Sequence, residues 1–165
     1  MQKNEFVISR TFSAPPQKVW EAWTDNGKLS QWFGPKGSSI TYSKNDFKIG
    51  GVFHYKMKDE NGIEMWGKWV YKEISAPSKL VVVDSFSDEK GGITRHPFER
   101  NWPLEMLSTT TLEEKNGKTL MTVRWKPVNE TPLERQAFEN GFESMTQGWG
   151  GTLDRLEKYL AQKAR

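Results

Sequence analysis

Residues 138–160 read FENGFESMTQGWGGTLDRLEKYL, and this stretch says more about the fold than any other part of the chain. Its apolar side chains recur at spacings of three or four, which places them along one face of a helix: Phe138, Phe142, Met145, Trp149, Leu153, Leu156 and Leu160. Upstream, Thr131 and Glu134 have the spacing of a capping box. The pattern predicts one long C-terminal helix whose apolar face packs against another layer.

Three glycines, Gly148, Gly150 and Gly151, interrupt this helical pattern. Each costs about 1 kcal/mol relative to alanine inside a helix. A glycine-rich loop that binds phosphate should follow a strand and open a helix, whereas these glycines lie within a helical stretch. We therefore expect a kink or close helix–sheet packing beside Trp149 rather than a phosphate site.

Between residues 38 and 126 the hydrophobic period changes to two, which is typical of strands. The dipeptides Asn61-Gly62 and Asn116-Gly117 tolerate the positive φ angles of tight hairpins. The sheet is therefore predicted to be an antiparallel meander. Residues 87–103 read as a long loop, and loops of that length often border a functional opening.

The N-terminal part predicts one strand followed by two short helices. Residues 5–12, EFVISRTF, alternate as a strand does. Ser13 is a candidate cap, and Pro15-Pro16 suits a first helical turn. This helix is expected to end near residues 25–27, and a second short helix to carry Leu29, Trp32 and Phe33.

This element order predicts an α+β fold. A curved antiparallel β-sheet would wrap around the long C-terminal helix, with two short helices after the first strand. The absence of repeats, linkers and low-complexity stretches predicts a single domain over residues 1–165.

Several motifs in this order also occur together in one known superfamily. They are Phe12-Ser13-Ala14-Pro15, Val19-Trp20-Glu21-Ala22-Trp23-Thr24, Trp32-Phe33-Gly34-Pro35, Gly50-Gly51-Val52-Phe53, Gly148-Trp149 and Leu153-Asp154-Arg155-Leu156. The sequence resembles the START-like (SRPBCC) superfamily, in particular the branch related to the activator of the heat-shock protein 90 ATPase. The resemblance covers nearly the whole chain and implies the helix-grip fold. Gly150 and Gly151 depart from the family pattern, which usually has other residues there.

The resemblance implies a scaffold and leaves the chemistry open, because related proteins include lipid carriers, polyketide cyclases, self-protection proteins and co-chaperones. Aromatic and methionine side chains on converging faces are typical of a pocket for a hydrophobic or aromatic small molecule. The candidate lining residues are Trp32, Phe33, Phe53, Tyr55, Met57, Trp69, Tyr71, Phe138, Phe142, Met145 and Trp149. Trp32 and Phe33 are expected at its entrance and Trp102 at its lid. The alternative is that these side chains simply fill the core.

No catalytic signature accompanies this pattern. The chain has no cysteine and two histidines, His54 and His96, with no metal-binding spacing. We predict neither a metal nor a cofactor. Candidate acid–base groups are Tyr55, Tyr71, Glu105 and Arg124, although for Arg124 the pattern favours the outer face of the sheet over such a role.

Three functions therefore remain open. The first is non-catalytic binding of a hydrophobic small molecule, and the second is a cyclase- or hydratase-like enzyme without metal or covalent nucleophile, resembling the polyketide cyclases. The third is a module that activates a chaperone ATPase. As the resemblance implies, that third role normally involves a further N-terminal domain, whereas this chain begins with its first strand.

Charge and hydropathy argue against two kinds of partner. The 24 lysines and arginines and 21 acidic residues, with a net charge of +3, are interspersed along the chain, so no basic stripe for nucleic acid is predicted. No apolar run approaches the ~20 residues of a membrane span, and the N-terminus lacks the apolar segment of an export signal. We expect a cytoplasmic protein.

Overall fold

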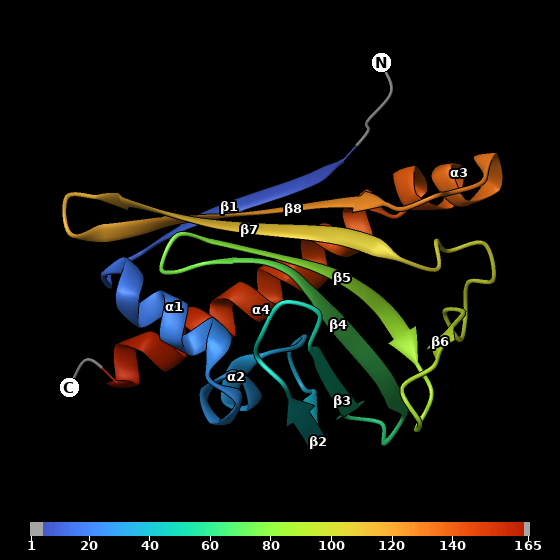
Figure 1. Cartoon of the computed structure of the whole chain (residues 1–165), viewed down its shortest axis with the longest axis horizontal. Helices are drawn as coiled ribbons and strands as arrows, with labels where there is room; N and C mark the ends of the chain where they lie inside the picture. The colour runs from blue at the N-terminus through green and yellow to red at the C-terminus, as the bar shows by residue number, and fades with distance from the viewer. Residues whose placement is uncertain (1–4, 164–165) are drawn as a thin grey trace.

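A computed structural model describes residues 5–163 and places the elements in the expected order (Figure 1). They are β1 (Phe6–Phe12), α1 (Pro16–Thr24), α2 (Asn26–Trp32), β2 (Ser39–Asn45), β3 (Val52–Lys58), β4 (Glu64–Ser75), β5 (Lys79–Ser87), β6 (Ile93–Thr94), β7 (Met106–Lys115), β8 (Lys118–Pro127), α3 (Pro132–Asn140) and α4 (Phe142–Lys163). The predicted α+β helix-grip architecture is confirmed. None of the helices within residues 5–163 is long and apolar enough to cross a membrane.

The sheet is an antiparallel meander to which the first strand is added at one edge. Its order is β1-β8-β7-β5-β4-β3-β2, and the two-residue strand β6 pairs with β5 within the predicted loop. Asn116 and Gly117 have φ angles of 55° and 79° between β7 and β8, as a tight hairpin requires. The predicted meander is therefore confirmed.

Helix α4 crosses one face of the curved sheet (Figure 1). Leu153 and Leu156 of the helix are fully buried, as are Phe53, Met121 and Val123 of the sheet. The core thus lies between these two layers. Burying one such side chain contributes about 1.5–3 kcal/mol to the free energy of unfolding, which holds the helix against the sheet.

The C-terminal helical stretch is divided, and the prediction of one long helix was wrong at this point. Helix α3 has the predicted capping box between Thr131 and Glu134, but it ends at Asn140, with Gly141 as its C-cap. A Cβ atom on Gly141 would lie 2.9 Å from Cζ3 of Trp102. The break therefore lies where the long loop packs against the helix, a contact that the local pattern does not reveal.

The expected close packing does not account for the glycines in α4. The helix runs continuously through Gly148, Gly150 and Gly151. Cβ atoms added to Gly148 and Gly150 would have no neighbour within 4 Å, and one on Gly151 would be in ordinary contact with Lys36. Close packing does not require glycine at these positions.

The first helices begin at residues other than those expected. Pro15, rather than Ser13, precedes α1, and no side chain caps that helix. Asp25 accepts a hydrogen bond from the backbone N–H of Lys28 at 3.0 Å and so caps α2. Gly27 lies inside α2 rather than after α1.

Candidate functional site

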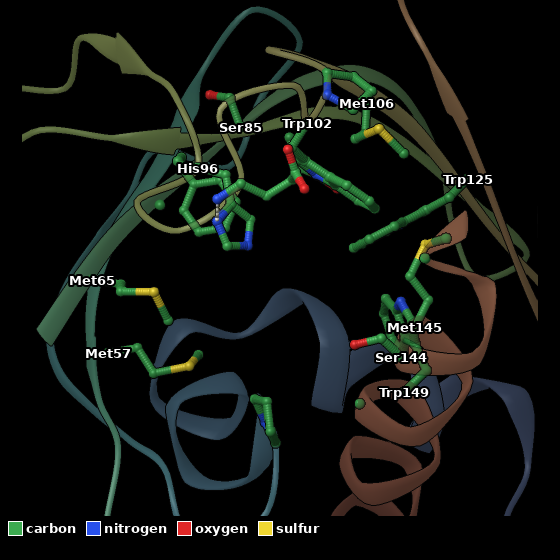
Figure 2. Close-up of a pocket in the computed structure, with 18 of the residues that line it drawn as sticks. Met57, Met65, Ser85, His96, Trp102, Met106, Trp125, Ser144, Met145 and Trp149 are labelled. Carbon is green, nitrogen blue, oxygen red and sulfur yellow. Dashed lines mark hydrogen bonds between the residues drawn. The ribbon is translucent and has the colours of Figure 1, made fainter. Parts of the chain in front are cut away.

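A pocket of about 600 Å³ lies between the sheet and α4. Figure 2 shows Met57 and Met65 on one side of it and Met145 and Trp149, from α4, on the other. This volume falls within the range of pockets that hold drug-sized ligands. Strand ends, residues 144–152 of α4 and the loop that follows β6 therefore border a space large enough for a small molecule.

Six of the eleven candidate residues line the pocket, namely Phe33, Tyr55, Met57, Trp69, Met145 and Trp149. Their rings pack against one another: the centroid of Phe33 lies 5.1 Å from that of Trp69 and 5.8 Å from that of Tyr55, both edge to face. Such contacts hold the wall of the pocket rigid.

The other five candidates lie outside this lining. Trp32 is 1% exposed and donates its indole N–H to the carbonyl of Ala22 at 3.0 Å, so it is a core residue and not part of an entrance. Phe53 is buried beneath Tyr55, with ring centroids 4.9 Å apart. The hydroxyl of Tyr71 donates to Oδ1 of Asn45 at 2.7 Å.

Phe138 and Phe142 form a separate aromatic group near the break between α3 and α4. Their ring centroids lie 5.1 Å apart, and Phe142 also packs edge to face on Phe6 at 5.7 Å. The apolar stripe predicted that they pack inward, but they contact each other and Phe6 instead of lining the pocket.

Asp84 is the functional candidate that the sequence analysis missed. It lies on β5, paired with Trp69 on β4 and Met106 on β7, and its side chain borders the pocket. Burial raises the pKa of Asp84 to about 8. A signal was present, because Asp84 shares strand parity with Leu80 and Val82, which are both buried.

Tyr55 lies next to this carboxyl group. Burial raises the pKa of Tyr55, and the nearby charge of Asp84 raises it further. The phenol therefore stays protonated at neutral pH and is a hydrogen-bond donor at the pocket wall. A protonated phenol and a carboxyl group of raised pKa side by side are a pair that can bind, donate or accept a proton.

His96 contributes a neutral ring to the pocket. Its Nδ1 atom accepts hydrogen bonds from the backbone N–H groups of Phe98 and Glu99, at 3.0 and 3.1 Å. Partial burial lowers the pKa of His96, against a smaller opposing effect of Glu99. Because Nδ1 is an acceptor, the ring carries its proton on Nε2 and is uncharged near pH 7.

The loop that carries Trp102 is attached to α3. Arg95 forms an ion pair with Glu134 of α3 and donates a hydrogen bond to the carbonyl of Trp102 at 3.3 Å. Trp102 lines the pocket, and its ring centroid lies 6.0 Å from that of Phe138. One arginine that contacts both segments thus holds Trp102 at the pocket lining.

The Trp32-Phe33-Gly34-Pro35 motif is held by α4. One guanidinium nitrogen of Arg155 donates to the carbonyls of Gly34 and Pro35 and to the hydroxyl of Ser38, at 3.0, 3.1 and 3.3 Å. Gly34 has a φ of 116°, where glycine is favoured. This contact joins two motifs far apart in the sequence and positions Phe33 at the pocket.

The remaining acid–base candidates lie elsewhere. Arg124 is half exposed and pairs with Glu5 at 2.7 Å, so it lies on the outer face of the sheet. Glu105 does not line the pocket. Within residues 5–163, no three histidine or acidic side chains lie close enough to hold a metal ion.

This architecture, a curved antiparallel sheet gripping a helix with a pocket between them, defines a helix-grip protein of the START-like class. The profile described as Activator of Hsp90 ATPase homolog 1-like protein matches residues 13–161. The chain belongs to this family. A search of curated proteins found no match.

Solved structures agree with this assignment. A Staphylococcus epidermidis protein is 30% identical, with 99% of this chain and 93% of that chain aligned and a TM-score of 0.76. An Arthrobacter aurescens protein is 26% identical, with 96% and 87% aligned and a TM-score of 0.77. A Nitrosomonas europaea protein is 25% identical, with 97% and 96% aligned and a TM-score of 0.76.

Proposed function

We propose that the protein binds a hydrophobic or aromatic small molecule in the pocket between the sheet and α4. The observation that carries this proposal is the pocket of about 600 Å³ with aromatic and methionine side chains around it. Methionine adapts its shape to a guest, and aromatic rings supply large apolar contact area. Family membership is compatible with such a role.

Native mass spectrometry of protein purified without added ligand tests this proposal first, followed by extraction of any bound compound. Retention of an aromatic or acyl compound would support it. A second measurement uses N-phenyl-1-naphthylamine, a neutral aromatic dye that fluoresces in apolar surroundings. Saturable binding with one site per chain is the expected result.

A matched pair of substitutions on α4 locates the binding site. Ser144→Phe introduces a ring into the pocket, because Ser144 lines it (Figure 2). Thr146→Phe adds a ring to an exposed position on the same helix that does not line the pocket. We expect the first variant to weaken dye binding at least tenfold and the second to leave it unchanged. Equal effects of the two would place the dye elsewhere.

Phe142→Trp is a further control. The sequence pattern predicts that this substitution weakens ligand uptake. Phe142 packs against Phe6 and Phe138 instead of lining the pocket. We now expect folded Phe142→Trp protein to bind the dye as the unsubstituted protein does.

Asp84 supports a second candidate function, that of a cyclase-like enzyme. A carboxyl group whose pKa is raised to about 8 suits a general acid near neutral pH. If catalysis occurs, the unsubstituted protein should convert an extracted compound on incubation while Asp84→Asn protein leaves it intact. Equal recovery from both proteins would exclude this role for Asp84.

The family description supports a third candidate, the activation of a chaperone ATPase. Stimulation of heat-shock protein 90 ATP hydrolysis by the purified chain would support it. A pocket-filling variant separates this role from ligand binding. If stimulation survives Ser144→Phe while dye binding is lost, the two activities use different surfaces.

A further inference from the structure

The ionisable side chains that border the pocket are mainly acidic, whereas the chain as a whole is basic. The protein has a net charge of +3, yet the carboxyl groups of Asp84 and Glu99 border the pocket and no lysine or arginine within residues 5–163 does. His96 accepts two backbone hydrogen bonds at Nδ1, and partial burial lowers its pKa, so its ring is uncharged near neutral pH. The pocket therefore disfavours anions and favours cations.

Asp84 lacks a protein partner that would stabilise its charged form. Burial is the one cause of its altered pKa, and no hydrogen bond or positive group within residues 5–163 opposes it. An ionised carboxyl group in such surroundings is unfavourable unless a cation or hydrogen-bond donors compensate. A positively charged guest would supply that compensation.

Aromatic rings surround the same point. A void of about 20 Å³ continues behind Asp84, and its lining includes the rings of Phe33, Trp69, Trp125 and Trp149. Trp125 and Trp149 lie edge to face, with centroids 5.5 Å apart. The faces of such rings attract cations, and tryptophan attracts them most strongly.

We propose that the ligand is an organic cation, in which an apolar body fills the pocket and a protonated or quaternary amine lies beside Asp84. The inference rests on the proposed function and specifies the class of ligand for that site. Asp84 supplies the countercharge, while the surrounding rings replace the water shell of the amine.

Proton release should accompany binding of such a cation. In the empty pocket the pKa of Asp84 is about 8, so a cation that binds the carboxylate at pH 7 displaces a proton. The other titratable groups that face the pocket are Tyr55 from β3 and His96 and Glu99 from the loop, whereas α4 presents Ser144 and Thr152, which do not titrate. For a ligand of permanent charge, affinity should rise up to about tenfold per pH unit between pH 6 and 8 and then level off.

A pair of ligands with the same shape tests the inference. Benzyltrimethylammonium is a permanent cation, and neopentylbenzene is its neutral carbon counterpart. Each competes with N-phenyl-1-naphthylamine in a fluorescence displacement assay on the full chain. At pH 8 we expect the cation to bind at least tenfold more tightly than neopentylbenzene. In Asp84→Asn protein this preference for the cation should disappear.

Glu99→Gln is the matched control, because it removes a carboxylate from the exposed rim of the same pocket. We expect it to change the affinity for the cation less than threefold. Circular dichroism of both variants verifies that they are folded.

The outcomes separate the two proposals. If the dye binds but the cation shows no preference or no pH dependence, the cation proposal is overturned while the small-molecule pocket stands. Tighter binding of neopentylbenzene than of the cation at pH 8 and above would also overturn it and would assign Asp84 the role of a neutral donor. If neither the dye nor the two competitors bind, both proposals fail.

Discussion

The ring of Tyr55 lies across the backbone of Gly67, its register partner on β4. A Cβ atom on Gly67 would lie 2.5 Å from Cζ and from the hydroxyl oxygen of Tyr55, which is closer than any real contact. Glycine at this position lets the phenol lie flat against the sheet, beside Asp84 and along the pocket wall.

Replacing Gly67 with alanine should therefore displace the Tyr55 ring. Overpacking of this kind lowers the free energy of unfolding by about 1–3 kcal/mol, and dye binding should weaken as the pocket wall moves. Urea unfolding and dye titration measure the two effects. In a Tyr55→Ala background the cost of Gly67→Ala should nearly vanish; an undiminished cost would mean that the strain arises elsewhere.

The glycines of α4 should be replaceable with a gain in stability. Gly148→Ala and Gly150→Ala add a methyl group that would meet nothing within 4 Å beyond the adjacent backbone of α4 itself, and alanine favours the helix by about 1 kcal/mol over glycine. Each variant should therefore unfold at a higher urea concentration with an unchanged slope. Destabilisation by either one would show that the helix must bend or open there.

Arg155 should contribute far more to stability than a surface arginine. Burial lowers the pKa of Arg155, and its guanidinium has three acceptors in the loop after α2. Arg155→Gln leaves those acceptors without their charged donor. The free energy of unfolding should therefore fall by about 2–3 kcal/mol.

Arg124→Gln is the matched control for Arg155, since it removes an exposed pair with Glu5. Such pairs contribute less than about 1 kcal/mol. Equal losses in the two variants, measured by chemical unfolding, would contradict the role assigned to Arg155.

The ion pair between Arg95 and Glu134 should control the mobility of the loop that carries Trp102. Glu134→Gln retains an oxygen for the backbone N–H of Thr131 but loses the charge that pairs with Arg95. We expect the free energy of unfolding to fall by about 1 kcal/mol at pH 7 and the backbone amides of residues 93–102 to exchange hydrogen faster. Unchanged exchange in this loop would mean that other contacts hold it.

The pH dependence of this effect follows from the carboxyl group of Glu134. The hydrogen bond from Arg95 is the largest of several contacts that lower the pKa of Glu134. The ionised Glu134 therefore contributes fully to the free energy of unfolding above the ordinary glutamate pKa, near 4.5. This contribution is lost as the pH falls through the lowered pKa of Glu134. The difference between Glu134→Gln and the unsubstituted protein should shrink in acid.

Asp84 should act on stability in the opposite direction. Burial raises its pKa from 3.8 to about 8, so the folded protein holds a proton that the unfolded chain has lost between these values. Stability should fall as the pH rises from about 4 to 8 on this account. Asp84→Asn should remove that decline and raise the melting temperature more at pH 8 than at pH 5; parallel profiles of the two proteins would contradict the raised pKa.

Local patterns predicted most of the secondary structure. The hairpin at Asn116-Gly117 and the capping box at Thr131 and Glu134 were predicted correctly, because each depends on residues within a few positions of one another. The alternation along the strands and the three-to-four spacing in the last helix depend on neighbours in the same way.

The pocket depended on contacts that no local pattern reveals. Strand parity placed Tyr55 and Met57 at the lining and helical spacing placed Met145 and Trp149 there. The same patterns also included Phe138 and Phe142, which lie outside the lining because their rings pack on each other and on Phe6.

The sequence by itself determined the elements, their order and the buried face of each, since hydrophobic periodicity and turn chemistry act over a few residues. Only the tertiary structure decided which buried residues fill the core and which border an open space. It also decided that Asp84 lies in the pocket wall with a pKa of about 8, because desolvation sums the effects of groups from β4, β7, β8 and α4 that are far apart along the chain.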